Sequence, residues 1–397
     1  MKVLVINAGS SSLKYQLIDT DSEFVILKGI IDRIGSVGMN TTHVYTLNGK
    51  KVNEDVLAKD HKEAVELVAK LIADNNLSID AIGHRVVHGG YKFFESVIID
   101  DEVIKYIEEF CNLAPLHNPP NLTGILSCRE IMPNVPQVAV FDTAFHQTIP
   151  AENYLYAIPY RYYEKYGIRR YGFHGTSHRY VTYKTAEFLG MNVGDANFIT
   201  CHLGNGASIT AVKNGKSFDT SMGFTPLEGV IMGTRCGDID PSIPLYIMDK
   251  ENISISDMDR ILNRESGILG ISGISNDMRL IEEEYFKPEG GNSRAILAFK
   301  MYCNRIRKYI GGYFFELGKV DAIVFTAGVG ENSPITRKKI LEGLEFVGIE
   351  IDDEANDRTI RGQSGLISKP SSKVKVVVMP TNEELAIALD AKRLLSK

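Results

Sequence analysis

The chain has 397 residues, which exceeds the size at which a single hydrophobic core usually stops growing, so we expect two domains. Apolar residues make up 44% and charged residues 24%, as in packed globular proteins, and the formal charge is −6. This acidic balance argues against a nucleic-acid or anionic-membrane partner, although a few convergent cations can still form a local phosphate site.

The cysteines and the first residues bear on the cellular compartment. The sequence contains five widely spaced cysteines and no C-x-x-C pair, a usage typical of a reducing compartment rather than a disulfide framework or a zinc site. The apolar run that begins the sequence ends at Asn7, which is too short for a signal peptide. No later stretch reaches the ~18 apolar residues of a membrane helix. We therefore expect a cytoplasmic protein.

Strand-like runs alternate with helical patterns along the chain, which indicates an α/β fold. The expected elements are, in chain order, a strand at 3–7, a helix at 102–113, a strand at 138–141, a long helix at 293–317, a strand at 322–326, a strand at 376–379 and a helix from 385.

Two segments share one plan of strand, small-residue turn and strand. The first runs through residues 3–17 and the second through residues 199–213, and aligning Ser12 with Ser208 places both turns between their strands. Asn214-Gly215 then supplies a further hairpin turn. The repeat suggests two related domains, although hairpins with glycine turns are common.

Three glycine turns are candidate phosphate-binding elements. They are Asn7 to Ser12, His202 to Gly206, and the segment 325–332 with Gly328 and Gly330. Backbone N–H groups and hydroxyls in such turns can cradle phosphate oxygens, whereas the plain alternative is an ordinary turn. The sequence has no G-x-x-x-x-G-K-[ST] and no complete dinucleotide fingerprint, which argues against a P-loop enzyme and a Rossmann dehydrogenase.

Two arginines lie in glycine-flanked segments rather than on a helical pattern. Arg85 lies within residues 83–90 and Arg235 within residues 233–238. The planar guanidinium fork matches a carboxylate or a phosphoryl group, although a structural arginine that caps carbonyls is the more frequent case.

The histidine pairs His84/His88 and His174/His178 have a spacing that can bind zinc on a helix. Neither carries the Glu of H-E-x-x-H, and the glycines and turn formers around both argue against helices and against metal binding. We interpret His174 instead as a hydrogen-bond donor on a loop.

Two acidic residues follow apolar strands. Asp142 comes directly after the strand at 138–141, where a carboxylate is well placed for a ligand site, although it could equally cap the next turn. Glu383 follows the last strand and could bind Mg²⁺ or act as a favourable acid in the first turn of a helix.

Together these segments resemble the acetate kinase family from the first strand to the last helix. The most specific motifs are residues 5–14 (VINAGSSSLK) and 200–208 (TCHLGNGAS). Those that follow the same family order are 83–90 (GHRVVHGG), 113–119 (LAPLHNP), 171–178 (YGFHGTSH), 233–238 (GTRCGD) and 381–384 (TNEE).

The resemblance implies the actin/hexokinase type of fold, with two duplicated α/β domains and the active site in the cleft between them. The implied domains are 1–146 with 385–397, and a nucleotide-binding domain at 147–384. It also implies a homodimer and the reversible in-line transfer of the ATP γ-phosphoryl group to acetate, giving acetyl phosphate and ADP, with Mg²⁺ or alternatively Mn²⁺.

The resemblance also implies roles for particular residues. The catalytic residues are Asp142, His174, Arg85 and Arg235, and the metal residues are Asn7 and Glu383. The substrate-binding residues are Arg85, Val87, Leu116, His117, Phe173 and Pro226. The nucleotide-binding residues are Ser10, Ser12, Lys14, His202, Leu203, Gly204, Asn205, Gly206, Asp277, Met278, Arg279, Gly328, Val329, Gly330, Glu331 and Asn332.

Alternative activities are a propionate kinase, which shares these motifs, and a non-carboxylate ATPase of the same superfamily. A butyrate kinase is disfavoured by the short implied pocket, and a sugar kinase would leave both arginines without a task. A chaperone would need a separate peptide-binding domain, for which the chain leaves no room.

Overall fold

The computed structural model describes residues 1–36, 40–115 and 117–396 of the chain. The chain forms two compact units: unit 1 comprises Met1–Gln147 with Asn382–Lys397, and unit 2 comprises Thr148–Thr381. The predicted boundaries at residues 146 and 384 lie within one and three residues of these unit limits, and helix α15 (Glu383–Leu395) packs against the strands of unit 1. Glu383 therefore belongs to unit 1.

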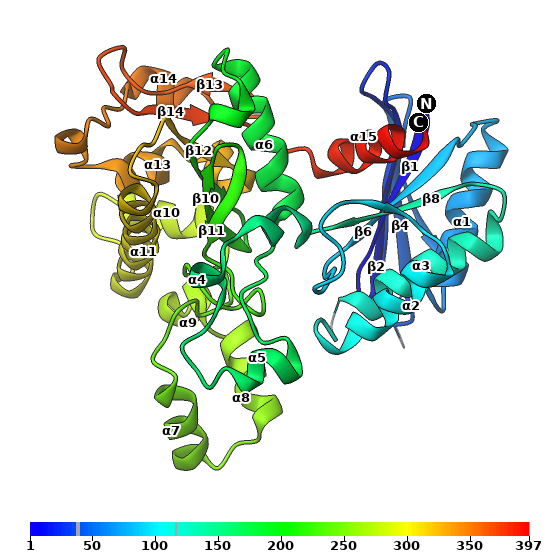
Figure 1. The fold of residues 1–397 in the computed structure, drawn as a ribbon, viewed down its shortest axis with the longest axis horizontal. Coiled ribbons are helices and arrows are strands. Elements are labelled where there is room, and N and C mark those ends of the chain that lie inside the picture. The colour runs from blue at the N-terminus through cyan, green and yellow to red at the C-terminus, as the bar shows by residue number, and fades with distance from the viewer. Residues whose placement is uncertain (37–39, 116, 397) are drawn as a thin grey trace. The chain divides into compact units, whose positions relative to one another are not determined.

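Unit 1 contains an eight-stranded sheet with the order β5-β4-β3-β2-β1-β6-β8-β7 (Figure 1). The strands are β1 (Lys2–Ala8), β2 (Ser12–Asp19), β3 (Phe24–Asp32), β4 (Thr41–Leu47), β5 (Lys50–Val56), β6 (Ala81–Val86), β7 (Val97–Ile98) and β8 (Gln137–Phe141). Strands β1, β6 and β8 are parallel, and the remaining pairs are antiparallel.

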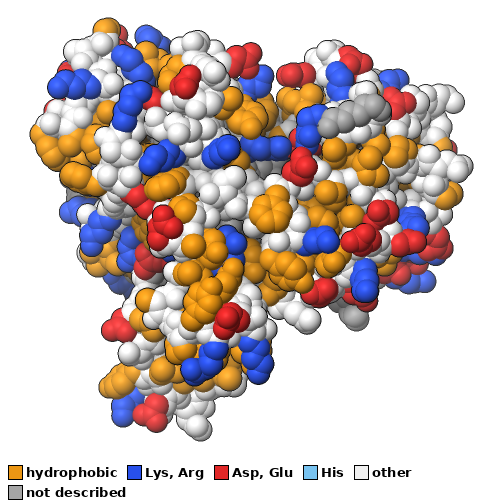
Figure 2. Space-filling model, viewed as in Figure 1, with side chains coloured by type: hydrophobic (Ala, Val, Ile, Leu, Met, Phe, Trp, Pro, Cys, Tyr) orange, Lys and Arg blue, Asp and Glu red, His pale blue; other side chains and the backbone are white. Residues whose placement is uncertain are grey.

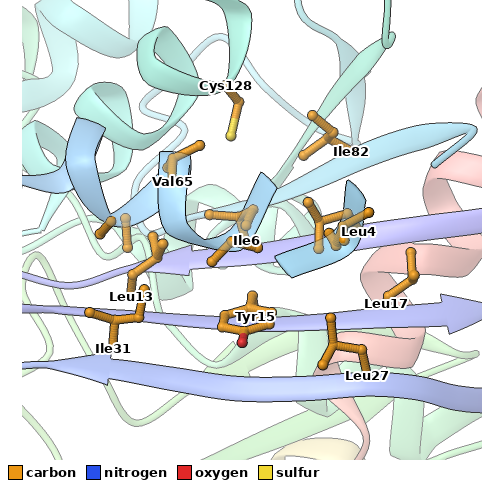
Figure 3. Close-up of a cluster of buried hydrophobic side chains, with 14 of the residues drawn as sticks. Leu4, Ile6, Leu13, Tyr15, Leu17, Leu27, Ile31, Val65, Ile82 and Cys128 are labelled. Carbon is orange, nitrogen blue, oxygen red and sulfur yellow. The ribbon is translucent and has the colours of Figure 1, made fainter. Parts of the chain in front are cut away.

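Helices cover the sheet of unit 1 on both faces. They are α1 (His61–Asp74), α2 (Asp101–Glu109), α3 (Asn118–Ile131) and α15. Because side chains alternate along a strand, Leu13, Tyr15 and Leu17 of β2 point to one core, where they meet Val65 of α1 and Cys128 of α3 (Figure 3).

Helix α15 packs on β1, β6 and β8. A Cβ on Gly83 would lie 2.6 Å from Ile387 Cγ2 of α15, so the missing side chain allows the helix to approach the sheet closely.

Unit 2 repeats this plan in a six-stranded sheet with the order β11-β10-β9-β12-β14-β13. Its strands are β9 (Phe198–Leu203), β10 (Ala207–Lys213), β11 (Lys216–Thr220), β12 (Ala322–Thr326), β13 (Gly365–Leu366) and β14 (Lys375–Val378). From β11 to β13 across this sheet, the first two neighbouring pairs are antiparallel, the next two are parallel and the last is antiparallel. The neighbouring pairs from β3 to β7 in unit 1 have the same directions in the same order. The two sheets are therefore duplicates in topology.

The predicted hairpin repeat is present, but the proposed alignment is wrong at the turn. The last ladder pair of the first hairpin is Ala8↔Leu13, and that of the second is Leu203↔Ala207. The first turn is one residue longer, so Ser12, the first residue of β2, comes before the first ladder pair with β1, while Ser208 already pairs with His202 of β9.

The helices of unit 2 include the predicted long helix, α11 (Ser293–Leu317), with the expected bounds. The others are α4 (Ala151–Tyr154), α5 (Arg161–Tyr166), α6 (Gly175–Phe188), α7 (Ser242–Glu251), α8 (Ile255–Arg264), α9 (Gly267–Ser272), α10 (Met278–Phe286), α12 (Ala327–Asn332), α13 (Pro334–Leu341) and α14 (Asp353–Arg358). Among the described residues, no helix has the length and apolar character needed to cross a membrane.

The prediction that no helix forms around His174 and His178 is wrong at His178. Helix α6 begins at Gly175, and His178 lies in its first turns with both ring nitrogens near buried hydroxyls, Thr200 Oγ1 at 2.7 Å and Ser208 Oγ at 2.7 Å. These tertiary hydrogen bonds override the low helix propensity of the glycine and hydroxyl residues.

Candidate active site

An arginine and a buried carboxylate meet at the carboxyl ends of two parallel strands in unit 1. Arg85 lies near the end of β6, and Asp142 directly follows β8. Arg85 Nε and Nη2 both donate to Asp142 Oδ2, at 3.0 and 2.7 Å. Asp142 is 1% exposed, and its charge raises the pKa of Arg85 above its ordinary value. Arg85 is thus held by its carboxylate partner as a permanent cation.

Glu383, in the first turn of α15, adds a second carboxylate to this region. Burial raises the pKa of Glu383 to about 7, an effect that the charge of Arg85 opposes and that of Asp142 reinforces. Lys14 of β2 also lowers the pKa of Glu383, and the β1–β2 ladder pairs Lys14 with Asn7. Five predicted residues therefore share one end of this sheet: Asn7, Lys14, Arg85, Asp142 and Glu383.

Oxygen donors at this end fit a magnesium ion. The Glu383 carboxylate and the Asn7 amide oxygen are the ligand types that Mg²⁺ prefers, and the ion commonly completes its shell with water and substrate phosphates. Within the described part of the chain, no cluster of three or more His, Cys, Asp or Glu side chains could hold a metal unaided. The raised pKa of Glu383 fits a carboxylate that awaits a cation, because a nearby positive charge favours its ionised form.

The loop after β6 is fixed by two asparagines of α3. Val87 N–H donates to Asn121 Oδ1 at 3.1 Å, and Asn118 exchanges hydrogen bonds with the N–H and carbonyl of His88 at 3.0 and 2.9 Å. Val87 is consequently buried at 7% exposure. Of the other predicted substrate residues in unit 1, His117 is exposed as the N-cap of α3, and Leu116 lies outside the described residues.

Three histidines form a hydrogen-bonded group in unit 2. His174 precedes α6 with a φ of 57°, and its Nδ1 lies 2.9 Å from Ser208 Oγ. His174 stacks on His202, with ring centroids 4.1 Å apart, and His202 Nδ1 lies 2.8 Å from Ser177 Oγ. Since Ser208 also contacts His178, one hydroxyl joins two imidazoles and fixes their orientation.

Arg235 lies beside this group, and none of the residues that the structure describes supplies it with a counter-ion. A Cβ on Gly206 would lie 3.3 Å from Arg235 Nη1 and 3.5 Å from His174 Nε2, which places both donors next to the bare backbone of the turn. Arg235 Nη1 donates to the Pro226 carbonyl at 3.3 Å, but no Asp or Glu of the described residues forms an ion pair with it. Burial lowers the pKa of Arg235, and the charge of an anionic ligand would offset this cost of desolvation. The predicted residue Phe173 is buried next to His174 in sequence.

A cavity of about 600 Å³ in unit 2 collects half of the predicted nucleotide residues. Those that line it are Gly204, Asn205, Asp277, Met278, Arg279, Gly328, Val329 and Asn332. A Cβ on Gly233 would lie 1.9 Å from Asn205 Oδ1, so this position requires glycine. The structure therefore brings together segments that are more than a hundred residues apart in sequence.

Some predicted nucleotide residues do not line this cavity. Ser10, Ser12 and Lys14 lie in unit 1, while His202, Leu203 and Gly206 lie at the hairpin end of unit 2 outside the lining. Glu331 has a structural contact, because its Oε1 accepts from Ala327 N at 2.8 Å and Thr381 N at 3.1 Å. Gly330 is buried, and its carbonyl accepts from Arg337 Nη1 at 2.9 Å.

Sequence reasoning missed several residues of the cavity wall. They are Gly233, Ile268, Asn276, Glu282, Tyr302 and Ser333. Gly233 begins the recognised motif at 233–238, and Asn276 directly precedes the predicted nucleotide-binding residues Asp277 to Arg279. Tyr302 reads as an ordinary apolar position of a long helix, so no local signal distinguishes it.

The repeated sheet order, with glycine turns at the strand ends of each unit, defines the actin/hexokinase type of fold. Comparison with known proteins narrows this class. The model of the acetokinase family matches residues 2–389, and the chain belongs to that family. The predicted resemblance and fold class are thus confirmed.

The chain is similar to proteins with established names over its whole length. The acetate kinase of Thermotoga maritima is 57% identical over 100% of this chain and 99% of its own. The crystal structure of Porphyromonas gingivalis acetate kinase is 46% identical, with a TM-score of 0.94 over 99% of each chain. That of a propionate kinase from Francisella tularensis is 42% identical, with a TM-score of 0.92 over 99% of each chain.

Proposed function

We propose that this protein transfers the γ-phosphoryl group of ATP to the carboxylate of acetate, reversibly, giving acetyl phosphate and ADP. Family membership and the full-length similarity to acetate kinases support the reaction. The observation that carries it is Arg235, a desolvated cation with no carboxylate partner among the described residues, next to a histidine and a bare glycine turn. Such a group of donors suits a phosphoryl group in transfer.

The chemistry requires charge stabilisation more than base catalysis. Acetate is already ionised at neutral pH, so the barrier lies in bringing an anion to a polyanion and in spreading charge over the phosphoryl oxygens. In our proposal Arg235 and His174 stabilise those oxygens, and Arg85 binds the acetate carboxylate. Asp142 keeps the guanidinium of Arg85 in a fixed orientation through the two hydrogen bonds to Oδ2.

Asn7 and Glu383 would hold the magnesium ion, which neutralises phosphate charge when it is bound. Ser10, Ser12 and Lys14 would lie along the phosphate path, and the segment from His202 to Gly206 would donate backbone N–H groups to the β- and γ-phosphates. In the cavity of unit 2, Asp277 to Arg279 and Gly328 to Asn332 would hold the adenosine.

Val87, Leu116, His117, Phe173 and Pro226 remain the residues that we propose for binding the acceptor. Val87 and Phe173 are buried apolar side chains, which suit a methyl group. The similarity to a propionate kinase makes propionate the second candidate acceptor. One extra methylene changes pocket binding by only about 1–3 kcal/mol, so we expect secondary activity with propionate.

Trapping acyl phosphate as hydroxamate tests the proposal. With ATP and Mg²⁺, we expect the highest kcat/KM on acetate, a lower value on propionate and little product from butyrate. Preference for propionate would change the acceptor but keep the reaction type. Absence of product from all three carboxylates would refute the proposal.

The variant Arg235→Ala tests whether Arg235 stabilises the transferred phosphoryl group. Since an arginine that stabilises phosphoryl transfer contributes ~10³–10⁵ in rate, we expect turnover to fall at least ~10²-fold. Arg264→Ala, an exposed arginine of the same unit, is the matched control and should leave turnover unchanged. Near-normal turnover of Arg235→Ala would remove this residue from the mechanism.

The assembly and location are further parts of the proposal. All five cysteines are free, which suits a cytoplasmic protein. A homodimer is supported by exposed apolar side chains of unit 2, including Leu245 at 69% and Tyr246 at 64% on α7 and Ile255 at 79% on α8. Figure 2 shows orange side chains over the segment that carries α5, α7 and α8 in Figure 1.

A further inference from the structure

The cavity of unit 2 carries two carboxylates with different surroundings. Asp277 is balanced by its neighbour, because Arg279 Nη2 donates to Asp277 Oδ2 at 2.6 Å and Arg279 Nε to Oδ1 at 3.0 Å. Glu282, one turn further along α10, is half-buried and forms no ion pair with any Lys or Arg in the described part of the chain. The cavity wall is therefore locally anionic at Glu282.

Two hydroxyls hold the Glu282 side chain in one orientation. Ser333 Oγ and Thr336 Oγ1 both donate to Oε1, the second at 2.5 Å. Ser333 is itself fixed as the N-cap of α13, where its Oγ accepts from Thr336 N–H at 3.0 Å. Both donors act on the same oxygen, and Oε2 accepts no hydrogen bond from any of the residues that the structure describes.

A second polar atom on the same wall, like Oε2 of Glu282, makes no hydrogen bond with the described residues. Tyr302 of α11 is 1% exposed and lines the cavity, and its hydroxyl makes no hydrogen bond within the described ranges. Buried hydroxyls are nearly always paired, so an unpaired one at a cavity wall indicates that a ligand or water completes it.

We propose that Oε2 of Glu282 accepts a hydrogen bond from a donor group of the nucleoside, so that this wall determines which nucleoside triphosphate is preferred. A fixed carboxylate repels phosphates, so it belongs at the nucleoside end of the ligand. The donors available there are the exocyclic amino group of adenine and the ribose hydroxyls. A 6-oxo purine presents an acceptor in place of the amino group and would face the carboxylate unfavourably.

The inference rests on the proposed use of ATP, and Glu282→Gln tests it. Glutamine keeps the size of the side chain but loses the charge. The substrates are ATP, ITP, 2′-deoxyATP and 3′-deoxyATP at saturating acetate, with kcat/KM as the readout. We expect the wild-type protein to prefer ATP, and Glu282→Gln to lose about tenfold or more on ATP, since hydrogen bonds to charged groups are strong.

The four nucleotides distinguish the two donors. If the amino group is the partner, Glu282→Gln leaves ITP nearly unchanged, and the ATP/ITP preference collapses. If a ribose hydroxyl is the partner, the variant leaves one of the deoxynucleotides unchanged instead. An equal loss on all four nucleotides, or no loss on any, would overturn the inference.

Two controls separate folding and acceptor chemistry from nucleoside recognition. Glu283→Gln, an exposed glutamate on the same helix, should leave the nucleotide preference unchanged. Ser333→Ala keeps the charge but removes one orienting hydroxyl, and should give a smaller loss with the same nucleotide pattern, which an unfolded variant could not show. Calorimetric binding of ATP and ITP without acetate gives a second readout. If no carboxylate is phosphorylated but this binding preference depends on Glu282, the proposed acceptor fails and the inference holds.

Discussion

Arg337 is a fully buried arginine whose replacement should destabilise unit 2 and weaken nucleotide use. It is 0% exposed. Its guanidinium donates to Asn356 Oδ1 at 2.8 Å and to four carbonyls, those of Gly330 at 2.9 Å, Glu331 at 3.0 Å, Asn356 at 2.7 Å and Thr359 at 3.0 Å. These bonds connect the turn of α12 to α14.

The size of the effect follows from two opposing terms. A hydrogen bond from a charged donor contributes at least about 1.5 kcal/mol, so the set contributes roughly 7 kcal/mol. Burial lowers the pKa of Arg337 to about 10, which corresponds to an opposing cost of roughly 3 kcal/mol. We therefore expect Arg337→Met to lower the free energy of unfolding by about 4 kcal/mol. Arg337→Lys should cost less, because an ammonium retains three donors.

Denaturant titration of the full chain measures this loss, with kcat/KM for ATP as the second readout because the Gly330 and Glu331 carbonyls lie in the predicted nucleotide turn. Lys338→Met is the matched control, since the neighbouring Lys338 is exposed and its ion pair with Asp353 is a surface pair worth about 1 kcal/mol at most. An Arg337→Met variant as stable as this control would refute the reasoning.

Three further predictions concern unit 2. Burial raises the pKa of Asp219 to about 7, so the folded chain keeps a proton that the unfolded chain releases near pH ~4, and the free energy of unfolding falls between those values as pH rises. Asp219→Asn should remove this fall, and denaturant titrations should show a variant more stable than the wild type above the folded-state pKa; equal pH profiles would contradict this. Gly215→Ala should lower the melting temperature more than Gly190→Ala, because both positions have positive φ but only at Gly215 would a Cβ lie 2.3 Å from a carbonyl oxygen. Ser208→Ala should reduce kcat about tenfold with little change in KM, because it removes the hydrogen bond that orients Nδ1 of His174; an unchanged kcat would assign Ser208 a purely structural role.

Several elements could be predicted because local patterns determine them. The strand at 322–326 and the helix at 293–317 have the expected bounds, since the strand is a fully buried run after a glycine turn and the helix is a long, strongly patterned segment. Asn214 and Gly215 have φ values of 52° and 73°, as the predicted two-residue hairpin turn requires. The predicted family and activity class rested on motifs of this local kind.

The remaining features depend on contacts between distant segments. Helix α6 forms although its first residues favour turns, because His178 finds hydroxyl partners on β9 and β10. Glu282 reads as a surface residue of a helix, and only the fold places Ser333 against it. The return of the last helix to the first domain was expected from the family resemblance, and only residues 382–384 at its start fall in the other unit than expected.

The return of α15 to unit 1 has a consequence for how the chain matures during synthesis. Residues 148–381 are translated before α15, so unit 2 can fold as a continuous segment, whereas β1, β6 and β8 wait for the helix that covers them. Leu385, Ile387 and Ala388 of α15 are buried in the finished protein, so until then the nascent first unit exposes the surface that would hold them. Glu383 arrives on the same helix. The carboxylate that we assign to magnesium is thus added only after unit 2, and the ribosome-bound chain is expected to remain inactive until that helix has docked.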